Sequence, residues 1–306
     1  MAEAIRNVIS MRDFGREQIL RVLEVAADME SASHFGLLHG YILGLMFMEP
    51  STRTRLSFIS AMLKLGGEVM DFGDPERSSL KKGETFGDSV RMVGSYCDVI
   101  AIRHSLEGAA KLAAEISGRP VINAGDGANQ HPTQTFLDLY TIKKTKGQID
   151  DLDIGFVGDL RYSRTVHSLA AALTHFDCRQ HFIAPELLRA PPHLLEDLRA
   201  RNVPYDECED IAAILPRLDV LYCTRIQEER FADRVEYEKV KSAYRVDREL
   251  LESSKVKDSL KVMHPLPRVD ELSSDVDDTP YAVYFEQARN GVPVRQALLA
   301  MVLGKA

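Results

Sequence analysis

A chain of 306 residues is long enough for about two domains of ~150 residues, each able to bury a core. Apolar residues make up 45% of the sequence and charged residues 27%, which is typical of a soluble globular protein. The net charge of −8 argues against binding to nucleic acid or acidic membranes through overall charge, so an anion site requires a local group of Arg and Lys. The longest apolar run, residues 41–48, is far short of the ~20 residues that span a bilayer.

The N-terminus and the cysteines both indicate a cytoplasmic protein. Residues 1–6 contain no apolar signal-peptide core. The cysteines form no C-x-x-C pair, so they are typical of reduced, partly buried thiols rather than of disulfides or a zinc site. They are Cys97, Cys178, Cys208 and Cys223.

The first half of the chain alternates between helical and strand patterns. A helix is predicted from Ser10 onward, followed by a strand over residues 41–48. The next helix begins in segment 51–55 and ends at Gly66 and Gly67, because glycine is favoured just after a helix. Further strands are predicted over residues 69–72, 99–103 and 120–123, and further helices over residues 84–96, 107–117 and 132–146. This alternation indicates βαβ units and a parallel sheet.

The second half repeats the alternation after the polar stretch 143–148. Strands are predicted over residues 154–157, 181–184, 219–224 and 260–263, and helices from residue 165 and over residues 192–201 and 295–304. We therefore predict an α/β protein of two domains, each with a central parallel sheet flanked by helices. The predicted domains are residues 1–147 and 148–291, and the final helix, about residues 292–304, is expected to pack back on the first domain.

The most distinctive segment is Ser51-Thr52-Arg53-Thr54-Arg55, where a predicted strand passes into a helix. The first turn of a helix presents unpaired N–H groups and the positive end of the helix dipole, which together favour an anion. The hydroxyls and guanidiniums of this segment add donors suited to phosphate. Taken alone, the segment is equally consistent with an ordinary Ser N-cap followed by solvated arginines.

Other polar segments follow the predicted strands, where open parallel sheets bind their ligands. Arg103 ends one strand, and a glycine-bearing loop after another leads to His131 and Gln134 at a helix start. In the second half, Arg164 and Arg225 follow strands, where each could hold a carboxylate or simply form a surface ion pair. Neither half contains G-x-G-x-x-G or G-x-x-x-x-G-K-[ST], so the usual nucleotide-binding signatures are missing.

Four segments together form a recognisable pattern: residues 51–55, residues 103–108, residues 123–134 and His264-Pro265-Leu266-Pro267-Arg268. In this pattern the chain resembles the catalytic chains of the aspartate carbamoyltransferase family, in register from about residue 8 to residue 303. The Ser-Thr-Arg-Thr and His-Pro-x-Gln segments are shared by all carbamoyltransferases. Pro265 resembles the aspartate branch, because ornithine carbamoyltransferases carry Cys in its place.

The resemblance implies a carbamoyltransferase fold and transfer of the carbamoyl group of carbamoyl phosphate to the amine of L-aspartate. The products would be N-carbamoyl-L-aspartate, for de novo pyrimidine biosynthesis, and phosphate. The family's roles imply that the phosphate is held by Ser51, Thr52, Arg53, Thr54 and Arg103. The carbonyl oxygen, on which negative charge develops as the amine attacks, would be polarised by Thr54, Arg103 and His131. The carbamoyl amide would be held by Gln134 and the backbone carbonyls of Pro265 and Leu266, with Pro267 in the same site.

For the second substrate, the resemblance implies that the carboxylates of L-aspartate are held by Arg164, Arg225 and Gln227. It also implies that a loop carrying Ser78 and Lys82 enters the active site of a neighbouring subunit, where Lys82 acts in catalysis and aspartate binding. We therefore expect a homotrimer with shared sites. Without the resemblance, a charged loop of this kind is simply a solvated turn.

No metal, cofactor or covalent intermediate is expected, because carbamoyl phosphate is already activated and can react through positioning and electrostatic stabilisation.

Ser163 departs from the family, which commonly has Gly at this position. If the position requires a positive φ, Ser would be strained by about 1 kcal/mol. Two rivals stay open: a carbamoyltransferase for ornithine or another amine, and a catalytically silent binding or assembly subunit. Binding of the family's zinc-bearing regulatory chain also stays open, and no nucleic acid or membrane partner is expected.

Overall fold

The chain divides into two units at positions that lie inside helices. The computed structural model describes residues 5–73, 82–226, 231, 233–241 and 243–306. Unit 1 contains Met1–Tyr140 and Asn290–Ala306, and unit 2 contains Thr141–Arg289. The boundaries fall within helix α5 (Pro132–Lys146) and helix α11 (Tyr284–Val302), whereas the sequence pattern places them after residues 147 and 291.

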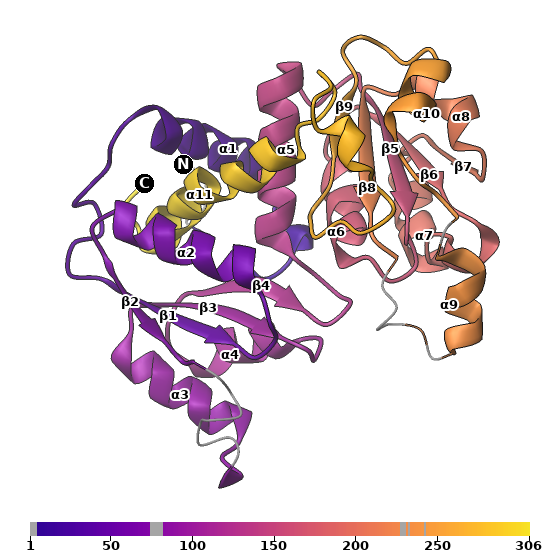
Figure 1. Cartoon of the computed structure of the whole chain (residues 1–306). Coiled ribbons are helices and arrows are strands. Elements are labelled where there is room, and N and C mark those ends of the chain that lie inside the picture. Colours follow the sequence, from indigo (N-terminus) through magenta and orange to yellow (C-terminus); the bar gives the residue numbers. More distant parts are fainter. Residues whose placement is uncertain (1–4, 74–81, 227–230, 232, 242) are drawn as a thin grey trace. The chain divides into compact units, whose positions relative to one another are not determined.

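Unit 1 is built on a four-stranded parallel sheet in the order β2-β1-β3-β4 (Figure 1). Its strands are β1 (Ile42–Phe47), β2 (Glu68–Asp71), β3 (Val99–His104) and β4 (Val121–Asp126). Apart from β2, these strands consist mainly of buried residues, as expected for a parallel sheet covered on both faces.

Helices cover both faces of this sheet (Figure 1). On one face, α3 (Phe86–Tyr96) and α4 (Ala109–Ile116) pack against strand residues such as Ile100 and Ile102. The other face carries α1 (Arg16–Ser31), α2 (Thr52–Lys64) and the end of α11. The helix predicted from Ser10 begins instead at Arg16, because Ser10 caps a separate 3-10 turn and Gly15 is extended.

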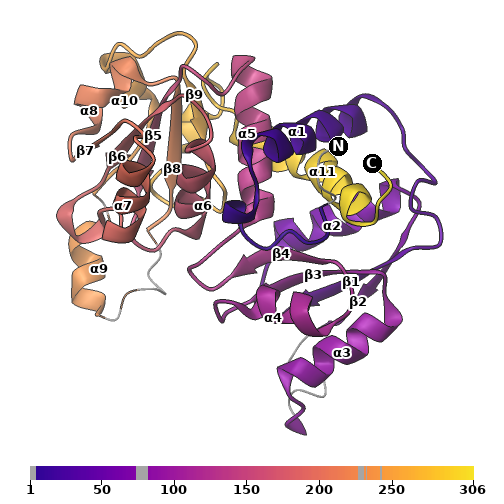
Figure 2. The same ribbon diagram turned by 180° about the vertical axis from the view of Figure 1, so that it is seen from behind.

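Unit 2 has a five-stranded parallel sheet in the order β7-β6-β5-β8-β9. The strands are β5 (Asp153–Gly158), β6 (Arg179–Ile183), β7 (Tyr205–Cys208), β8 (Val220–Thr224) and β9 (Lys261–Met263). Two helices, α6 (Arg164–Leu173) and α7 (Pro192–Ala200), cover one face of this sheet (Figure 2). The core of the other face includes Val157, Leu221 and Leu251.

Several elements of unit 2 differ from the prediction. Strand β7 and three short helices were not predicted: α8 (Ile211–Ile214), α9 (Arg234–Val240) and α10 (Arg248–Ser253). Strand β7 has the polar sequence YDEC at the sheet edge and so lacks an apolar run. Helix α11 begins at Tyr284, well before the predicted start at residues 292–295, and Pro293 lies inside the helix.

The cysteine thiols are free. Cys97, Cys178 and Cys223 are buried, and Cys208 is partly exposed. Burial raises the pKa of Cys97 to about 11 and that of Cys178 to about 12, so both remain protonated at neutral pH. In the part of the chain that the structure describes, no helix combines the length and apolar character needed to cross a membrane.

Candidate functional site

The strands where a sheet reverses its order carry seven of the predicted site residues at their carboxyl ends: Ser51, Thr52, Arg53, Thr54, Arg103, Arg164 and Arg225. The order reverses between β1 and β3 in unit 1 and between β5 and β8 in unit 2. Open parallel sheets bind ligands at such points, because the loops that leave the two strands diverge there. The register pairs Phe47 with Arg103 and Gly158 with Thr224, so in each unit the two loops start side by side.

The start of helix α2 keeps the features of an anion site. Ser51 occupies the N-cap position with an extended backbone, but its side chain accepts no hydrogen bond from the helix. The first turn contains no acidic residue, and Thr54 is only 8% exposed. The exposed positions of this turn are Thr52 and Arg53. An ordinary Ser cap therefore does not account for the segment.

Carboxylates hold two arginines near this helix start in different ways. Arg103, at the end of β3, donates through Nη1 to the carbonyl oxygen of Ala124 at 3.3 Å, and its Nε lies 3.5 Å from Oε2 of Glu49. An anionic ligand would compete with Glu49 for this guanidinium. Arg55 donates through Nε to the Asp71 carboxylate on β2 at 2.8 Å, and so links α2 to the sheet.

One buried carboxylate organises the loops that follow β3 and β4. Asp126 is 2% exposed, and its Oδ1 accepts hydrogen bonds from Nδ2 of Asn123 at 2.9 Å and from the Gln130 N–H at 3.1 Å. Its Oδ2 accepts from the Gly108 N–H at 2.9 Å. Asp126 was not among the predicted site residues, although it lies in the Asn-Ala-Gly-Asp-Gly segment that belongs to the family pattern.

The start of helix α5 places His131 and Gln134. Both are buried, with 4% and 9% of their surface exposed, and the Gln134 N–H donates to the His131 carbonyl at 3.0 Å. Nε2 of Gln134 donates to Oδ1 of Asp138 at 2.9 Å. The spacing of four residues along one helix is a signal from which this partner could have been predicted.

In unit 2, two arginines follow the paired ends of β5 and β8. Arg164 is the first residue of α6, and Arg225 comes directly after β8. Oγ1 of Thr224 donates to Oγ of Ser163 at 3.2 Å, which links the two segments. Ser163 has φ −80°, so the strain expected for a positive φ does not arise. Gln227 lies outside the described residues.

A histidine holds the loop after β9. His264 is 1% exposed; its Nδ1 accepts from the Leu266 N–H and its Nε2 donates to Oε1 of Glu271, both at 2.8 Å. Because Nδ1 accepts, a neutral ring carries its proton on Nε2. Burial alone would raise the pKa of Glu271, but hydrogen bonds from His264 and the backbone lower it overall. Leu266 has φ +55° and precedes a cis bond to Pro267, while Pro265 is partly buried.

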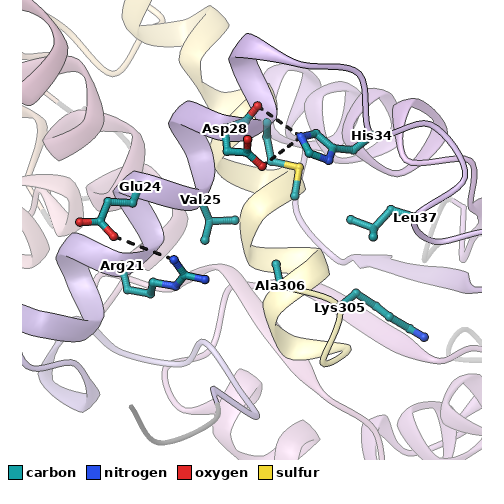
Figure 3. Close-up of a pocket in the computed structure, with 9 residues that line it drawn as sticks. Arg21, Glu24, Val25, Asp28, His34, Leu37, Lys305 and Ala306 are labelled. Atoms are coloured by element: carbon teal, nitrogen blue, oxygen red, sulfur yellow. Dashed lines mark hydrogen bonds and ion pairs between the residues drawn. The ribbon is translucent and has the colours of Figure 1, made fainter. Parts of the chain in front are cut away.

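The loop expected to reach a neighbouring subunit is described only in part. Lys82 is exposed just before α3, and Ser78 lies outside the described residues. A pocket of about 310 Å³ in unit 1 lies between α1 and the C-terminal residues Lys305 and Ala306 (Figure 3). No predicted site residue lines it; within its lining His34 lies 3.1 Å from Asp28, and Arg21 lies 4.0 Å from Glu24. Among the residues that the structure describes, no group of three His, Cys, Asp or Glu side chains could hold a metal ion.

Comparisons with protein families cover nearly the whole chain. Residues 6–144 match the carbamoyl-P binding domain of the aspartate/ornithine carbamoyltransferases, and residues 150–302 match their Asp/Orn binding domain. Among curated relatives, the aspartate carbamoyltransferase catalytic subunit of Thermococcus kodakarensis is 56% identical over 303 residues, which are 98% of this chain and 97% of the relative. That of Methanopyrus kandleri is 56% identical over 304 residues, 98% of each chain.

Solved structures agree with the sequence matches. The catalytic subunit of Methanocaldococcus jannaschii aspartate transcarbamoylase is 51% identical with a TM-score of 0.90, over 98% of both chains. Aspartate transcarbamoylase from Trypanosoma cruzi, solved in complex with carbamoyl phosphate and aspartate, is 36% identical with a TM-score of 0.91, over 97% of this chain and 96% of the other. With both halves of its sequence and its fold matched in this way, the chain belongs to the aspartate/ornithine carbamoyltransferase family.

Proposed function

We propose that this chain transfers the carbamoyl group of carbamoyl phosphate to the amine of L-aspartate, giving N-carbamoyl-L-aspartate, a precursor of pyrimidines, and phosphate. The observation that carries the proposal is the set of donors at the strand-order reversal of unit 1. There, a helix start without acidic residues follows β1 and Arg103 ends β3, while buried His131 and Gln134 follow β4, the next strand of the sheet. The T. cruzi relative, solved with carbamoyl phosphate and aspartate, supports the same pair of substrates.

Carbamoyl phosphate suits the donors of unit 1. The phosphate dianion is assigned to the α2 start and to the arginine that ends β3: Ser51, Thr52, Arg53, Thr54 and Arg103. His131, with Thr54 and Arg103, stabilises the charge that develops on the carbonyl oxygen as the amine attacks. Gln134 and the backbone of Pro265, Leu266 and Pro267 hold the carbamoyl amide. Residues 1–147 are accordingly proposed as the carbamoyl phosphate-binding domain.

L-Aspartate suits the arginines of unit 2. Its two carboxylates match Arg164 and Arg225, since each guanidinium can hold a carboxylate through two parallel hydrogen bonds. Ornithine would bring one carboxylate and a second amino group, so two arginines discriminate against it. Gln227 is proposed as a third contact, and residues 148–291 as the aspartate-binding domain.

The site is proposed to be completed by a neighbouring subunit of a cytoplasmic homotrimer. The proposal rests on the family pattern of the loop that carries Ser78 and Lys82. Lys82 is exposed on the described part of that loop, as a group that reaches another chain must be. Its ammonium would add positive charge near both substrates.

The deciding experiment is to incubate the purified chain with carbamoyl phosphate and L-aspartate and to measure phosphate and N-carbamoyl-L-aspartate. Equal amounts of both products are expected. Without the amine, phosphate should appear only through the spontaneous decay of carbamoyl phosphate. Citrulline formed preferentially from ornithine would overturn the choice of amine. Binding of both substrates without phosphate release would support a silent subunit instead. Arg53→Ala is expected to lower kcat/KM by roughly 100-fold or more, and Arg55→Ala, whose partner is Asp71, serves as the matched control.

A further inference from the structure

The side chain of Gln134 is held in one orientation. Its Nε2 donates to Oδ1 of Asp138, four residues further along α5, at 2.9 Å. An ionised carboxylate only accepts hydrogen bonds, so the amide nitrogen, rather than the amide oxygen, must face Asp138. The carbonyl oxygen Oε1 is then the end of Gln134 that can accept a hydrogen bond from a ligand.

A buried arginine supports the charge of Asp138. Arg295, on α11, is 2% exposed, and Asp138 is fully buried. Nη1 of Arg295 donates to the Gly291 carbonyl at 3.1 Å, and its Nη2 lies 3.4 Å from Oγ1 of Thr133. The guanidinium carbon of Arg295 lies 5.1 Å from the centre of the Phe58 ring. Burial lowers the pKa of Arg295 to about 9, and the attraction of Asp138 opposes this shift, so the guanidinium stays charged at neutral pH.

This arrangement is unusual for a pair that only stabilises the fold. Burying two opposite charges gains little over packing apolar groups, because each ion loses its hydration. Nε of Arg295 has no hydrogen-bond partner among the described residues, so the cost of burial is not fully compensated. A role at the neighbouring site explains why the charge of Asp138 is kept. Among polar side chains, an ionised carboxylate accepts hydrogen bonds without donating any, so it fixes the orientation of the Gln134 amide.

We propose that Asp138, supported by Arg295, is a positioning residue that presents the carbonyl oxygen of Gln134 to the NH2 group of the carbamoyl substrate. The inference rests on the proposed function, in which Gln134 holds that amide. A carbamoyl group carries two N–H donors, whereas an acetyl group carries a methyl in the same place. Asp138 thereby helps the site to select carbamoyl phosphate over acetyl phosphate, which has the same phosphate and carbonyl.

The test is to measure kcat/KM for carbamoyl phosphate and for acetyl phosphate, with L-aspartate saturating, in wild type and Asp138→Asn. Asn can present either its oxygen or its nitrogen to Gln134, so the orientation is no longer forced. In Asp138→Asn, kcat/KM for carbamoyl phosphate divided by that for acetyl phosphate is expected to fall about tenfold, which corresponds to the loss of one hydrogen bond. Inhibition by inorganic phosphate is expected to stay unchanged. A parallel loss for both acyl phosphates would show that Asp138 only stabilises the fold.

A second pair of variants keeps the test decisive if Asp138→Asn folds poorly. In Gln134→Glu, two carboxylates face each other and selection is expected to be lost. The double variant Gln134→Glu with Asp138→Asn restores a donor at position 138 and an acceptor at position 134, so the ratio is expected to recover. No recovery in the folded double variant would overturn the inference. If the wild type itself transfers no carbamoyl group, the proposed function fails and the inference with it; transfer with an unchanged ratio defeats the inference alone.

Discussion

At the scale of single residues, carboxylates hold the polar groups proposed to bind carbamoyl phosphate. Glu49 lies 3.5 Å from Arg103 and would compete with an anionic ligand for it, whereas Asp138 accepts a hydrogen bond from Gln134 and Glu271 accepts one from the histidine that supports the 265–267 loop. A side chain held by a buried hydrogen bond loses less freedom when a ligand binds, so Asp138 and Glu271 favour binding without touching the ligand.

The pair of His264 and Glu271 gives a pH-dependent prediction. Because the pKa of Glu271 is lowered in the folded state, its stabilising contribution is complete above the unfolded pKa of about 4.3 and is lost as the pH falls through the lower folded value. Glu271→Gln is expected to lower the free energy of unfolding by about 1 kcal/mol at neutral pH, and the difference from wild type should shrink in acid. Urea unfolding at several pH values measures this.

Glu252→Gln provides the matched control, because Glu252 is exposed on α10 and the substitution changes the charge in the same way. This control should differ little from wild type at any pH. A deficit of Glu271→Gln that grew as the pH fell would contradict the assigned role of the Glu271 carboxylate.

At the scale of elements, the strands formed by continuous buried apolar runs could be predicted from the sequence. Strands such as β1 and β8 were found because they are continuous apolar stretches, and their ends located the candidate donors. The helices α8, α9 and α10 were missed because none is longer than seven residues, although each has an Asp N-cap as a local signal. The partners of Arg103 and His264 depend on tertiary contacts, so periodicity does not reveal them.

The close approach of β5 and β8 gives a prediction at this scale. Gly158 has φ +115°, and a Cβ there would lie 2.1 Å from the carbonyl oxygen of Thr224. Gly158→Ala must therefore push apart the strand ends that precede Arg164 and Arg225. We expect a loss of more than about 2 kcal/mol in the free energy of unfolding, and a larger rise in KM for aspartate than for carbamoyl phosphate.

Gly147→Ala separates close approach from backbone strain. Gly147 also has a positive φ, +82°, but a Cβ there meets nothing within 4 Å. Its substitution should cost only about 1 kcal/mol and leave both KM values unchanged. Equal losses in the two variants, measured by denaturant unfolding, would show that the contact with Thr224 is unimportant.

At the scale of the whole molecule, each unit carries part of the donor set at its own strand-order reversal. The order of segments along the chain was sufficient to predict this, because loops after neighbouring parallel strands emerge at one edge of a sheet. A contribution from another chain cannot be deduced in this way, since no pattern within one sequence specifies its neighbour. The role of Lys82 therefore rests on resemblance and needs its own experiment.

Mixing inactive variants tests the proposed shared site. Arg53→Ala and Lys82→Ala are each expected to be inactive, because every site in either homotrimer lacks one group. In randomly mixed trimers a site is intact when one subunit supplies Arg53 and its neighbour supplies Lys82, so about one quarter of wild-type activity should return. Mixing Arg53→Ala with Arg103→Ala should restore nothing, because both residues belong to the same half of the site. If mixed trimers, verified by mass, regain no activity, Lys82 does not act across a subunit boundary.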